Sequence, residues 1–420
     1  MLPRLLALLA AAVLALGTPA RAPAQAAADT LAVPERERIV SGLDAAIRRY
    51  FAHWSAVPGL DYPAAYRAYR ERAMASSDRR EFDLATLEFL AGLRNGHTDF
   101  NDRWLWERHG APFPFSLRSS AGEWRVAWSG TPDLQPGDVV AAIDGEPFEA
   151  FFQRQKRYIS ASDERAARRR LSSQDYLFPE RFTLTLGDGR HVAVVRERPT
   201  APAVPAAAGP AAEAVPHRWL VQDSIAYLKV PGFGDPRYEA RALELLKTRY
   251  RSAPALIVDL RGNGGGSTPW KLRKALMGGQ GYRRWEVEEE KVGAPLLYRA
   301  AGPLVLRLYP VPAYRGKLVF LVDGGCASAC EDLVVSFKDN GRATLVGETT
   351  FGSTGQAFRM DFGNGMTARI GGRRVRLPGG APFEGVGIAP DVPVAPAVPG
   401  ARGDPVLERG LAVLRGPGGS

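Results

Sequence analysis

Apolar side chains recur at helical spacing through residues 29–108. The repeat is every four residues in the first part and every three in the second: Ile39, Leu43, Ile47 and Phe51, then Leu84, Leu87, Leu90 and Leu93. Such spacing gathers the apolar side chains on one face of a helix, so we predict a helical block over 29–108. Asp83, directly before Leu84, is predicted to cap the second helix.

The pattern changes to short strands between residues 112 and 199. Residues 182–186 and 191–195 flank an Asp-Gly turn, which is typical of a hairpin. Before them, residues 134–145 (LQPGDVVAAIDG) place a buried strand between two turns and resemble a segment of PDZ domains. PDZ domains bind peptides by adding them as a strand to a sheet edge. We therefore predict a β-rich, PDZ-like insert over 112–199, with a generic hairpin insertion as the alternative.

From residue 217 onward, buried strands alternate with amphipathic helices, which is the pattern of a layered α/β domain. The clearest elements are strands at 225–230, 256–260 and 318–322 and a helix at 238–250. We predict that this domain covers 217–400. Asp404-Pro405 then marks the start of a helix, so residues 401–420 are predicted to form a C-terminal helix and tail.

Two segments lie outside these blocks. Residues 1–26 combine Arg4, an apolar run and Ala24-Gln25-Ala26, which fits a cleavage site. The run is shorter than the roughly 20 residues that span a bilayer, so we predict a secretory signal and an exported, periplasmic or extracellular protein; a retained membrane anchor is the alternative. Residues 200–216 are rich in Ala and Pro and are predicted to be a linker or surface loop.

Composition narrows the class of protein. Of the 420 residues, 45% are hydrophobic and 24% are charged, the balance of a globular protein with a sizeable core. The net charge is +10, but the arginines are scattered, which argues against a nucleic-acid groove. The two cysteines, Cys326 and Cys330, have the wrong spacing for a CxxC redox pair and no nearby His for a zinc site. We interpret both as small buried residues, with a disulfide as the alternative.

The first candidate for chemistry is the loop DLRGNGGGS at residues 259–267, directly after a predicted strand. Three consecutive glycines allow backbone N–H groups to point outward at an anion. A phosphate-binding loop is the obvious rival, but the GK[ST] ending and the GxGxxG spacing are absent. The remaining use of such a loop is to stabilise the oxyanion of acyl transfer.

The second candidate is GGCASACE at residues 324–331, where a predicted strand ends and a helix begins. Ser328 stands at this junction, where an attacking hydroxyl is held exposed and the next N–H, that of Ala329, can help to hold an oxyanion. The alternative for Ser328 taken alone is an ordinary helix N-cap.

A serine nucleophile needs a base, and His is the usual one. Of the five His, His97 is best placed to enter a cleft, because it follows Gly96 in a polar turn after an apolar helix. A structural His is the alternative. Glu384, between Gly-rich turns, could orient the imidazole or could be a solvated turn residue.

Together, four segments resemble the tail-specific or C-terminal processing peptidases and their tricorn-core relatives. The segments stand in the same order as in that family: DLRGNGGGS, CASACED, GETTFGSTGQ and EGVGIAPDVPV. An N-terminal helical block ending in GHT and a PDZ-like insert extend the resemblance over most of the chain. The resemblance implies a serine peptidase whose catalytic domain, over 217–400, has a ClpP/crotonase-like α/β spiral. His97 would then come from the N-terminal helical domain.

Position by position, Ser328 matches the family's nucleophile, and Ala329 with Gly264 or Gly265 matches its oxyanion donors. Ser353 stands where the bacterial enzymes carry a catalytic Lys, so a Ser-Lys dyad is excluded there. The tricorn-like branch uses a His and a supporting Glu instead, and His97 and Glu384 match these positions. Tricorn has a Ser before the His, where this chain has Gly96. Thr98 or Ser353 is left to link His97 to Glu384.

The expected function is therefore that of an exported serine peptidase acting on peptide or protein substrates through an acyl-enzyme on Ser328. Such chemistry requires neither a metal nor an organic cofactor. We expect no nucleic-acid partner and no membrane span after removal of the signal. A non-catalytic peptide-binding protein on the same fold and an acyl-ester hydrolase are the alternatives.

Overall fold

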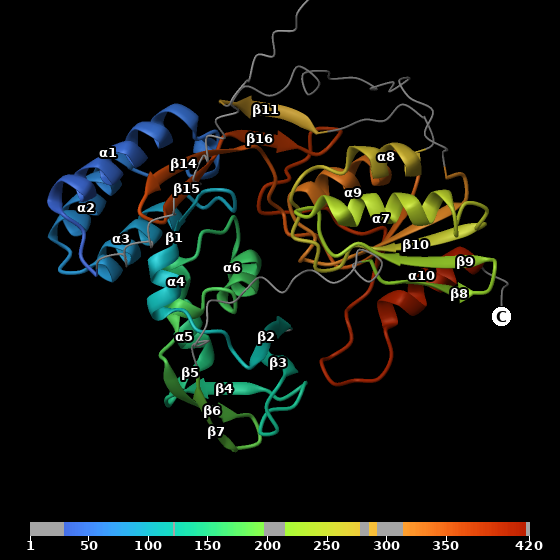
Figure 1. The fold of residues 1–420 in the computed structure, drawn as a ribbon, viewed down its shortest axis with the longest axis horizontal. Coiled ribbons are helices and arrows are strands. Elements are labelled where there is room, and N and C mark those ends of the chain that lie inside the picture. Colours follow the sequence, from blue (N-terminus) through green and yellow to red (C-terminus); the bar gives the residue numbers. More distant parts are fainter. Residues whose placement is uncertain (1–28, 121, 197–214, 278–284, 292–313, 417–420) are drawn as a thin grey trace, which may run out of the picture.

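The computed structural model describes residues 29–120, 122–196, 215–277, 285–291 and 314–416. The predicted signal at 1–26 and nearly all of the predicted linker at 200–216 lie outside these residues. The described part of the chain forms three bodies, which we call the N-terminal body, the insert and the core (Figure 1). Among these residues, no helix combines the length and the apolar character that crossing a membrane requires.

The N-terminal body is mainly helical, as predicted. Its elements are α1 (Val33–Tyr50), η1 (Trp54–Ala56), α2 (Tyr62–Ala75), α3 (Arg79–Ala91), β1 (Asp99–Asp102) and α4 (Arg103–His109). Ile39, Leu43 and Ile47 are fully buried, which confirms the four-residue spacing of α1.

The predicted cap of α3 was wrong. The N-cap is Asp78, whose side chain accepts from the Glu81 N–H, and the helix begins at Arg79. Asp83 therefore lies inside the helix and is buried. Arg79 and Arg80 are good helix formers, so the helix extends back beyond the first leucine of the repeat.

A hairpin from late in the sequence completes the N-terminal body. Strands β14 (Ala357–Gly363) and β15 (Met366–Gly371) form a three-stranded antiparallel sheet with β1, in the order β1-β15-β14. Met366, Ala368 and Ile370 are buried in the same hydrophobic cluster as α1 and α3. The sequence pattern assigned these residues to the domain at 217–400, but they pack with the helices that begin the chain (Figure 1).

The insert contains the predicted strands together with two helices that the pattern did not indicate. It comprises β2 (Phe115–Ser120), β3 (Glu123–Ser129), β4 (Val140–Ile143), β5 (Glu146–Pro147), α5 (Phe148–Gln155), η2 (Lys156–Tyr158), α6 (Glu164–Leu171), η3 (Asp175–Leu177), β6 (Arg181–Leu186) and β7 (His191–Val195). Strands β6 and β7 form the predicted hairpin within a sheet of order β5-β4-β6-β7. Strands β2 and β3 form a separate pair.

The core is built on a six-stranded sheet of order β17-β13-β12-β10-β9-β8. Its strands are β8 (His217–Val221), β9 (Ile225–Lys229), β10 (Ala255–Asp259), β12 (Lys317–Val322), β13 (Thr344–Gly347) and β17 (Val392–Pro393). All neighbouring strands are parallel except β8 and β9. A two-stranded sheet of β11 (Glu286–Glu290) and β16 (Arg373–Arg376) stands apart from it.

Helices cover both faces of the core sheet. Helices α7 (Pro236–Lys247), α8 (Trp270–Met277) and α9 (Ala329–Asp339) pack on one face, and α10 (Pro405–Arg415) packs on the other (Figure 1). The alternation of strand side chains produces this division: Leu256 and Val258 join the first cluster and Ile257 the second. Because β10 and β12 are parallel neighbours, the loops that follow them meet at one edge of the sheet, where ligands of such folds bind.

Candidate active site

Ser328 occupies the N-cap position of α9, at the turn that follows β12. Its φ of 56° and ψ of −117° lie outside the regions that residues with a side chain ordinarily adopt. Such a conformation costs about 1–3 kcal/mol and persists only where the surroundings hold it. Two acceptors hold it here: the Ser328 N–H lies 3.1 Å from the Ser353 carbonyl oxygen and 3.0 Å from Glu331 Oε2.

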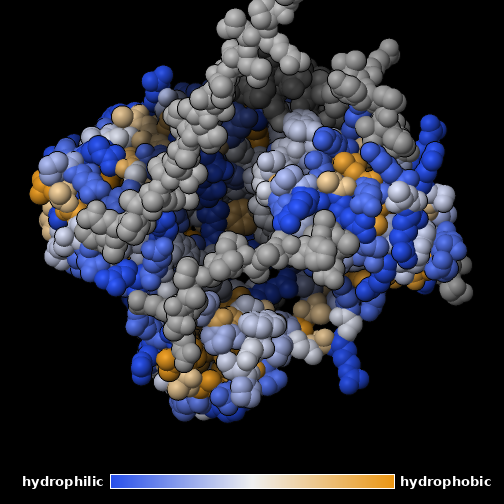
Figure 2. Space-filling view, viewed as in Figure 1, coloured by the Kyte–Doolittle hydropathy of each residue, from blue (hydrophilic) through white to orange (hydrophobic). Residues whose placement is uncertain are grey.

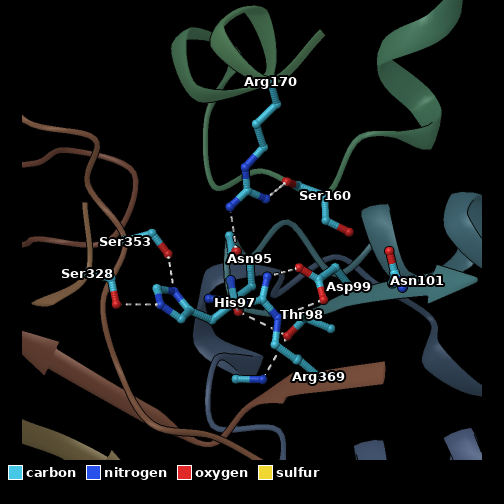
Figure 3. Close-up of polar contacts among 12 residues, drawn as sticks. Asn95, His97, Thr98, Asp99, Asn101, Ser160, Arg170, Ser328, Ser353 and Arg369 are labelled. Atoms are coloured by element: carbon cyan, nitrogen blue, oxygen red, sulfur yellow. Dashed lines mark hydrogen bonds and ion pairs between the residues drawn. The ribbon is translucent and has the colours of Figure 1, made fainter. Parts of the chain in front are cut away.

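His97 faces Ser328 from the other body. It lies in the turn between α3 and β1, and the pairing of β1 with β15 fixes the strand that follows it. The His97 Nε2 atom lies 3.1 Å from Ser328 Oγ, although 231 positions separate the two residues (Figure 3). This distance is within the reach of a general base from its nucleophile.

Ser353 connects His97 to Glu384. The His97 Nδ1 atom lies 2.8 Å from Ser353 Oγ (Figure 3). Ser353 Oγ in turn donates to Glu384 Oε1 at 2.8 Å. Because the hydroxyl donates its proton to the carboxylate, its oxygen accepts from the Nδ1–H of His97. This arrangement selects the tautomer whose Nε2 lone pair faces the Ser328 hydroxyl.

Thr98, the other candidate for this link, lies elsewhere. Its hydroxyl donates to Asn95 Oδ1 at 2.9 Å and accepts from the Gly371 N–H at 2.9 Å.

The missing side chain of Gly96 leaves the space that the Ser353 hydroxyl occupies beside His97. A Cβ at Gly96 would lie 2.6 Å from Ser353 Oγ. The absence of a side chain at 96 and the hydroxyl at 353 are therefore complementary.

Glu384 receives two further donors that the sequence did not point to. Asn95 Nδ2 donates to its Oε1 at 2.9 Å, and the Ser162 hydroxyl also donates to Oε1. The Ser162 oxygen in turn accepts from the Gly96 N–H at 2.9 Å. Ser162 lies in the insert just before α6, so all three bodies meet at this carboxylate. No local motif distinguishes Ser162 from other loop serines, whereas Asn95 lies two residues from His97.

A second buried carboxylate, Glu331, organises the turn that carries Ser328. Its two oxygens accept from the Ser328 N–H, the Thr350 hydroxyl and the N–H groups of Gly352 and Ser353. Burial raises the pKa of Glu331 to about 8, and these donors act in the opposite direction. Glu331 thus joins the turn that carries Ser328 to the loop that carries Ser353. Its position one turn into α9, facing the helix N-terminus, was the signal that could have identified it.

The predicted oxyanion donors differ in availability. Within the described part of the chain, the N–H groups of Ala329 and Gly264 make no hydrogen bond, whereas the Gly265 N–H donates to Asn263 Oδ1 at 2.9 Å. Gly265 instead lets the backbone of the glycine loop lie close to the turn that carries Ser328. A Cβ on it would lie 2.8 Å from both the Ala329 nitrogen and the Ser328 Cβ, and its φ is +90°. Gly264 is therefore the better candidate of the two glycines.

Cys326 and Cys330 are buried, as predicted, but the interpretation of them as separate small residues was wrong, because they form a disulfide. The turn at Ser328 folds the chain back so that the two Cα atoms lie 5.4 Å apart, within the range that a disulfide spans. The disulfide therefore joins the residue two positions before Ser328 to the residue two positions after it.

Ser328 and His97 line a cleft of about 960 Å³ that also contacts the insert. In the space-filling view, a hydrophilic hollow opens between the N-terminal body and the core (Figure 2).

Burial lowers the pKa of His97 to about 3, and the positive charges of Arg369 and Arg170 lower it further. Burial raises the pKa of Glu384 to about 7. Nowhere in the described residues do three His, Cys, Asp or Glu side chains group so that they could hold a metal ion.

Comparison with known sequences gives homologues for the core. Residues 224–394 match the model of peptidase family S41. The chloroplastic C-terminal processing peptidase of Tetradesmus obliquus is 27% identical over 177 residues, which cover 42% of this chain and 36% of that protein. The carboxyl-terminal-processing protease of Synechocystis is 30% identical over 176 residues, covering 40% of this chain and 37% of that protein. The matched segment thus spans about a third of these relatives' length, and the core is homologous to S41 peptidases.

Comparison with solved structures extends the likeness of fold beyond the core. The structure of mature CPAF in complex with lactacystin has a TM-score of 0.63 and 16% sequence identity. The superposition covers 86% of this chain and 94% of that one. The mixed α/β fold is therefore shared over most of the chain and extends beyond the segment that the family model matches.

Proposed function

We propose that the protein is a serine peptidase that hydrolyses peptide bonds of protein or peptide substrates through an acyl-enzyme on Ser328. One observation carries the proposal: a continuous line of hydrogen-bonding atoms runs from Ser328 Oγ through His97 and Ser353 to Glu384. Homology of the core to C-terminal processing peptidases supports the same conclusion.

The proposed reaction begins when His97 Nε2 takes the proton of the Ser328 hydroxyl and Ser328 Oγ attacks the carbonyl carbon of the scissile bond. The N–H groups of Ala329 and Gly264 stabilise the oxyanion that forms. The imidazolium then gives its proton to the leaving amine, the acyl-enzyme remains, and a water activated by His97 releases the acid product. Removal of one such donor typically costs about 2.7–4 kcal/mol of transition-state stabilisation.

Ser353 acts in this proposal as the relay between His97 and Glu384. Glu384 stabilises the charge that develops on the imidazole through the Ser353 hydroxyl. The proposal therefore includes a His/Glu branch like that of tricorn. The relay hydroxyl comes from position 353, beside a glycine at 96, where the tricorn branch has a serine before the histidine. No Lys follows Lys338 in the sequence, so a Ser-Lys dyad has no support.

The architecture proposed from the sequence fits this role. We interpret the core as the ClpP/crotonase-like catalytic domain, the insert as a PDZ-like domain and residues 1–26 as an export signal. A cleft bordered by all three bodies suits an extended peptide. The names of the relatives point to the carboxyl ends of proteins as the sites that are trimmed.

The proposal is tested by comparing wild-type protein with Ser328→Ala in the hydrolysis of an unfolded protein and of short fluorogenic peptides. Ser41→Ala, at an exposed serine of α1, is the matched control. We expect Ser328→Ala to abolish hydrolysis with an unchanged thermal midpoint, and Ser41→Ala to retain full activity. Residual turnover of Ser328→Ala within tenfold of wild type would reject the nucleophile. Hydrolysis of esters with no hydrolysis of peptides would instead indicate an esterase.

A further inference from the structure

The cleft beside Ser328 carries an excess of positive charge. Its charged lining consists of two aspartates and seven arginines: Asp323 and Asp332, then Arg118, Arg168, Arg169, Arg170, Arg359, Arg369 and Arg373. No Glu or Lys is among the described residues that line it. Field lines concentrate in such a partly enclosed space, so its arginines attract anions more strongly than scattered surface arginines do.

Neither aspartate forms an ion pair with these arginines, because backbone N–H, indole N–H and hydroxyl groups donate to their carboxylate oxygens. Asp323 Oδ1 accepts from the N–H groups of Gly262 and Gly325. Asp332 accepts from the Trp285 Nε1–H and from hydroxyl groups on Thr268 and Thr354.

Some of the arginines have carboxylates of their own. Arg168 is paired with Glu149 and Glu164, and Arg369 is paired with Asp99. The side chain of Arg170 donates instead to the backbone carbonyls of Ser160 and Gly96, and the side chain of Arg359 makes no hydrogen bond or ion pair within the described part of the chain.

Arg118 and Arg169 share a single carboxylate. Their guanidinium groups lie 2.8 Å and 3.3 Å from the same atom, Glu348 Oε2, and their side chains remain 27% and 28% exposed. Both arginines come from the insert, Arg118 from β2 and Arg169 from α6, whereas Glu348 belongs to the core. Two guanidinium groups beside one carboxylate leave one positive charge uncompensated, and the planar fork of a guanidinium is suited to binding a further carboxylate.

Gly324 brings this pair toward the nucleophile. A Cβ at Gly324 would lie 2.3 Å from the Arg169 Nε atom, so the guanidinium rests directly on the backbone of that residue. Gly324 precedes Ser328 by four positions in the same turn segment. The positive pair therefore stands on the wall of the cleft that also carries the reacting hydroxyl.

We infer that the cleft selects acidic peptide segments, with Arg118 and Arg169 binding a substrate carboxylate beside the scissile bond. This inference rests on the proposed function and adds the class of substrate to it. The carboxylate comes either from an Asp or Glu side chain or from the carboxyl terminus of the substrate, and the chemistry of recognition is the same for both.

Binding is measured separately from turnover by using Ser328→Ala as a trap. The probe is a fluorescently labelled, unstructured peptide with two Glu residues, together with matched peptides that carry Gln or Lys at the same positions. Each peptide is prepared with a free and with an amidated carboxyl terminus. We expect the Glu peptide to bind about tenfold more tightly than the Gln peptide at low salt, and this preference to shrink as ionic strength rises.

Three substitutions in the trap assign the preference to the pair. Arg118→Gln and Arg169→Gln should each reduce the preference for Glu to about twofold. Arg154→Gln is the matched control, because Arg154 is an exposed insert arginine paired with Glu146 and lies outside the lining of the cleft. Glu348→Gln acts in the opposite direction, since it releases both guanidinium groups and should increase the preference. Because a misfolded protein would not gain preference for the Glu peptide, the increase expected for Glu348→Gln tests the inference even where an arginine variant fails to fold.

The outcomes distinguish the two sources of the carboxylate and the two proposals. A preference for Glu in amidated peptides assigns the carboxylate to a side chain, and a preference that requires the free terminus assigns it to the chain end; both support the inference. Equal binding of Glu and Gln peptides in every form, tighter binding of the Lys peptide, or a preference that Glu348→Gln leaves unchanged would overturn it. Selective binding without turnover by the wild type would overturn the proposed function alone, and turnover without selectivity would overturn this inference alone.

Discussion

The two halves of the site are built in different ways. The core supplies Ser328, Ser353 and Glu384 from its loops, where Glu331 accepts from the backbone N–H groups of Ser328, Gly352 and Ser353. The N-terminal body and the insert supply His97 and Ser162, which reach the core through side-chain hydrogen bonds. The fold of the core alone fixes the positions of the first group of residues. The positions of His97 and Ser162 depend on how the N-terminal body and the insert pack against the core.

This difference teaches which contacts the chemistry depends on. Groups that react or share the moving proton should be indispensable whichever half they come from. Groups that only align the halves should have smaller and graded effects, because several contacts contribute to the alignment. Asn95, Ser162 and Ser353 all donate to the same oxygen of Glu384.

The largest expected effect tests whether the two halves act as one unit. His97→Ala and Ser328→Ala should each lower kcat by about 10⁴-fold or more, and the double variant should lose no more than the single ones, because residues that act together are strongly non-additive. Steady-state kinetics on a fluorogenic peptide measures all three. Losses that multiply in the double variant would mean that His97 acts independently of Ser328.

Glu384→Gln tests the role of the carboxylate at the end of the hydrogen-bonded series that begins at Ser328. The test compares how kcat/KM of the variant and of the wild type depends on pH. Burial raises the pKa of Glu384 to about 7 and lowers that of His97 to about 3. Between pH 5 and 8, His97 therefore stays neutral while Glu384 gains its proton as the pH falls. We expect kcat/KM of the wild type to fall as the pH drops through about 7.

The Gln variant mimics the protonated carboxyl group. Its kcat/KM should be about 10³-fold below that of the wild type at pH 8 and flat from pH 5 to 8. A profile of the variant that still falls through pH 7 would assign that titration to another group.

Ser353→Gly tests the proposed relay between His97 and Glu384. A serine introduced at position 96 should restore part of the lost activity. The single variant should lose about 10²-fold in kcat, within the range expected for a proton-transfer partner. Gly96→Ser combined with Ser353→Gly should recover at least part of this loss, because a side chain at 96 points at the position that Ser353 Oγ occupies. Gly96→Ser alone should be impaired by the clash with Ser353. A double variant no better than Ser353→Gly would contradict the relay.

Ser162→Ala should have the smallest effect, because Glu384 keeps two other donors. We expect a loss of about tenfold or less in kcat, the scale of one buried hydrogen bond. Ser172→Ala, in the same part of the insert and without contact to Glu384, is the control. A loss as large as that of Ser353→Gly would place Ser162 within the reacting line rather than among the aligning contacts.

The sequence predicted the parts of the molecule that are specified by neighbouring residues. The strands around 256–260 and 318–322, the glycine loop and the junction at Ser328 were all recognised because a strand, a turn and a helix follow one another within a few positions. His97 and Glu384 were candidates from their local surroundings, but structural alternatives stayed open for both until the family resemblance pointed to their roles.

Features that depend on distant contacts were missed. The hairpin of β14 and β15 alternates like any core strand pair, and only its distant contacts with β1 and with the cluster of α1 and α3 show that it belongs to the N-terminal body. Ser162 is one serine among many until the insert docks against Glu384. The cap of α3 is Asp78 and not the predicted Asp83, because the first leucine of the apolar repeat does not mark the start of the helix.

The central claim is that His97, from one body, activates Ser328, on another. Labelling with a fluorophosphonate probe followed by peptide mapping tests it most directly. We predict a single adduct on Ser328 in the wild type, none in Ser328→Ala and labelling slowed by at least about 10²-fold in His97→Ala. An adduct on a different serine, or equal labelling rates with and without the imidazole, would contradict the claim.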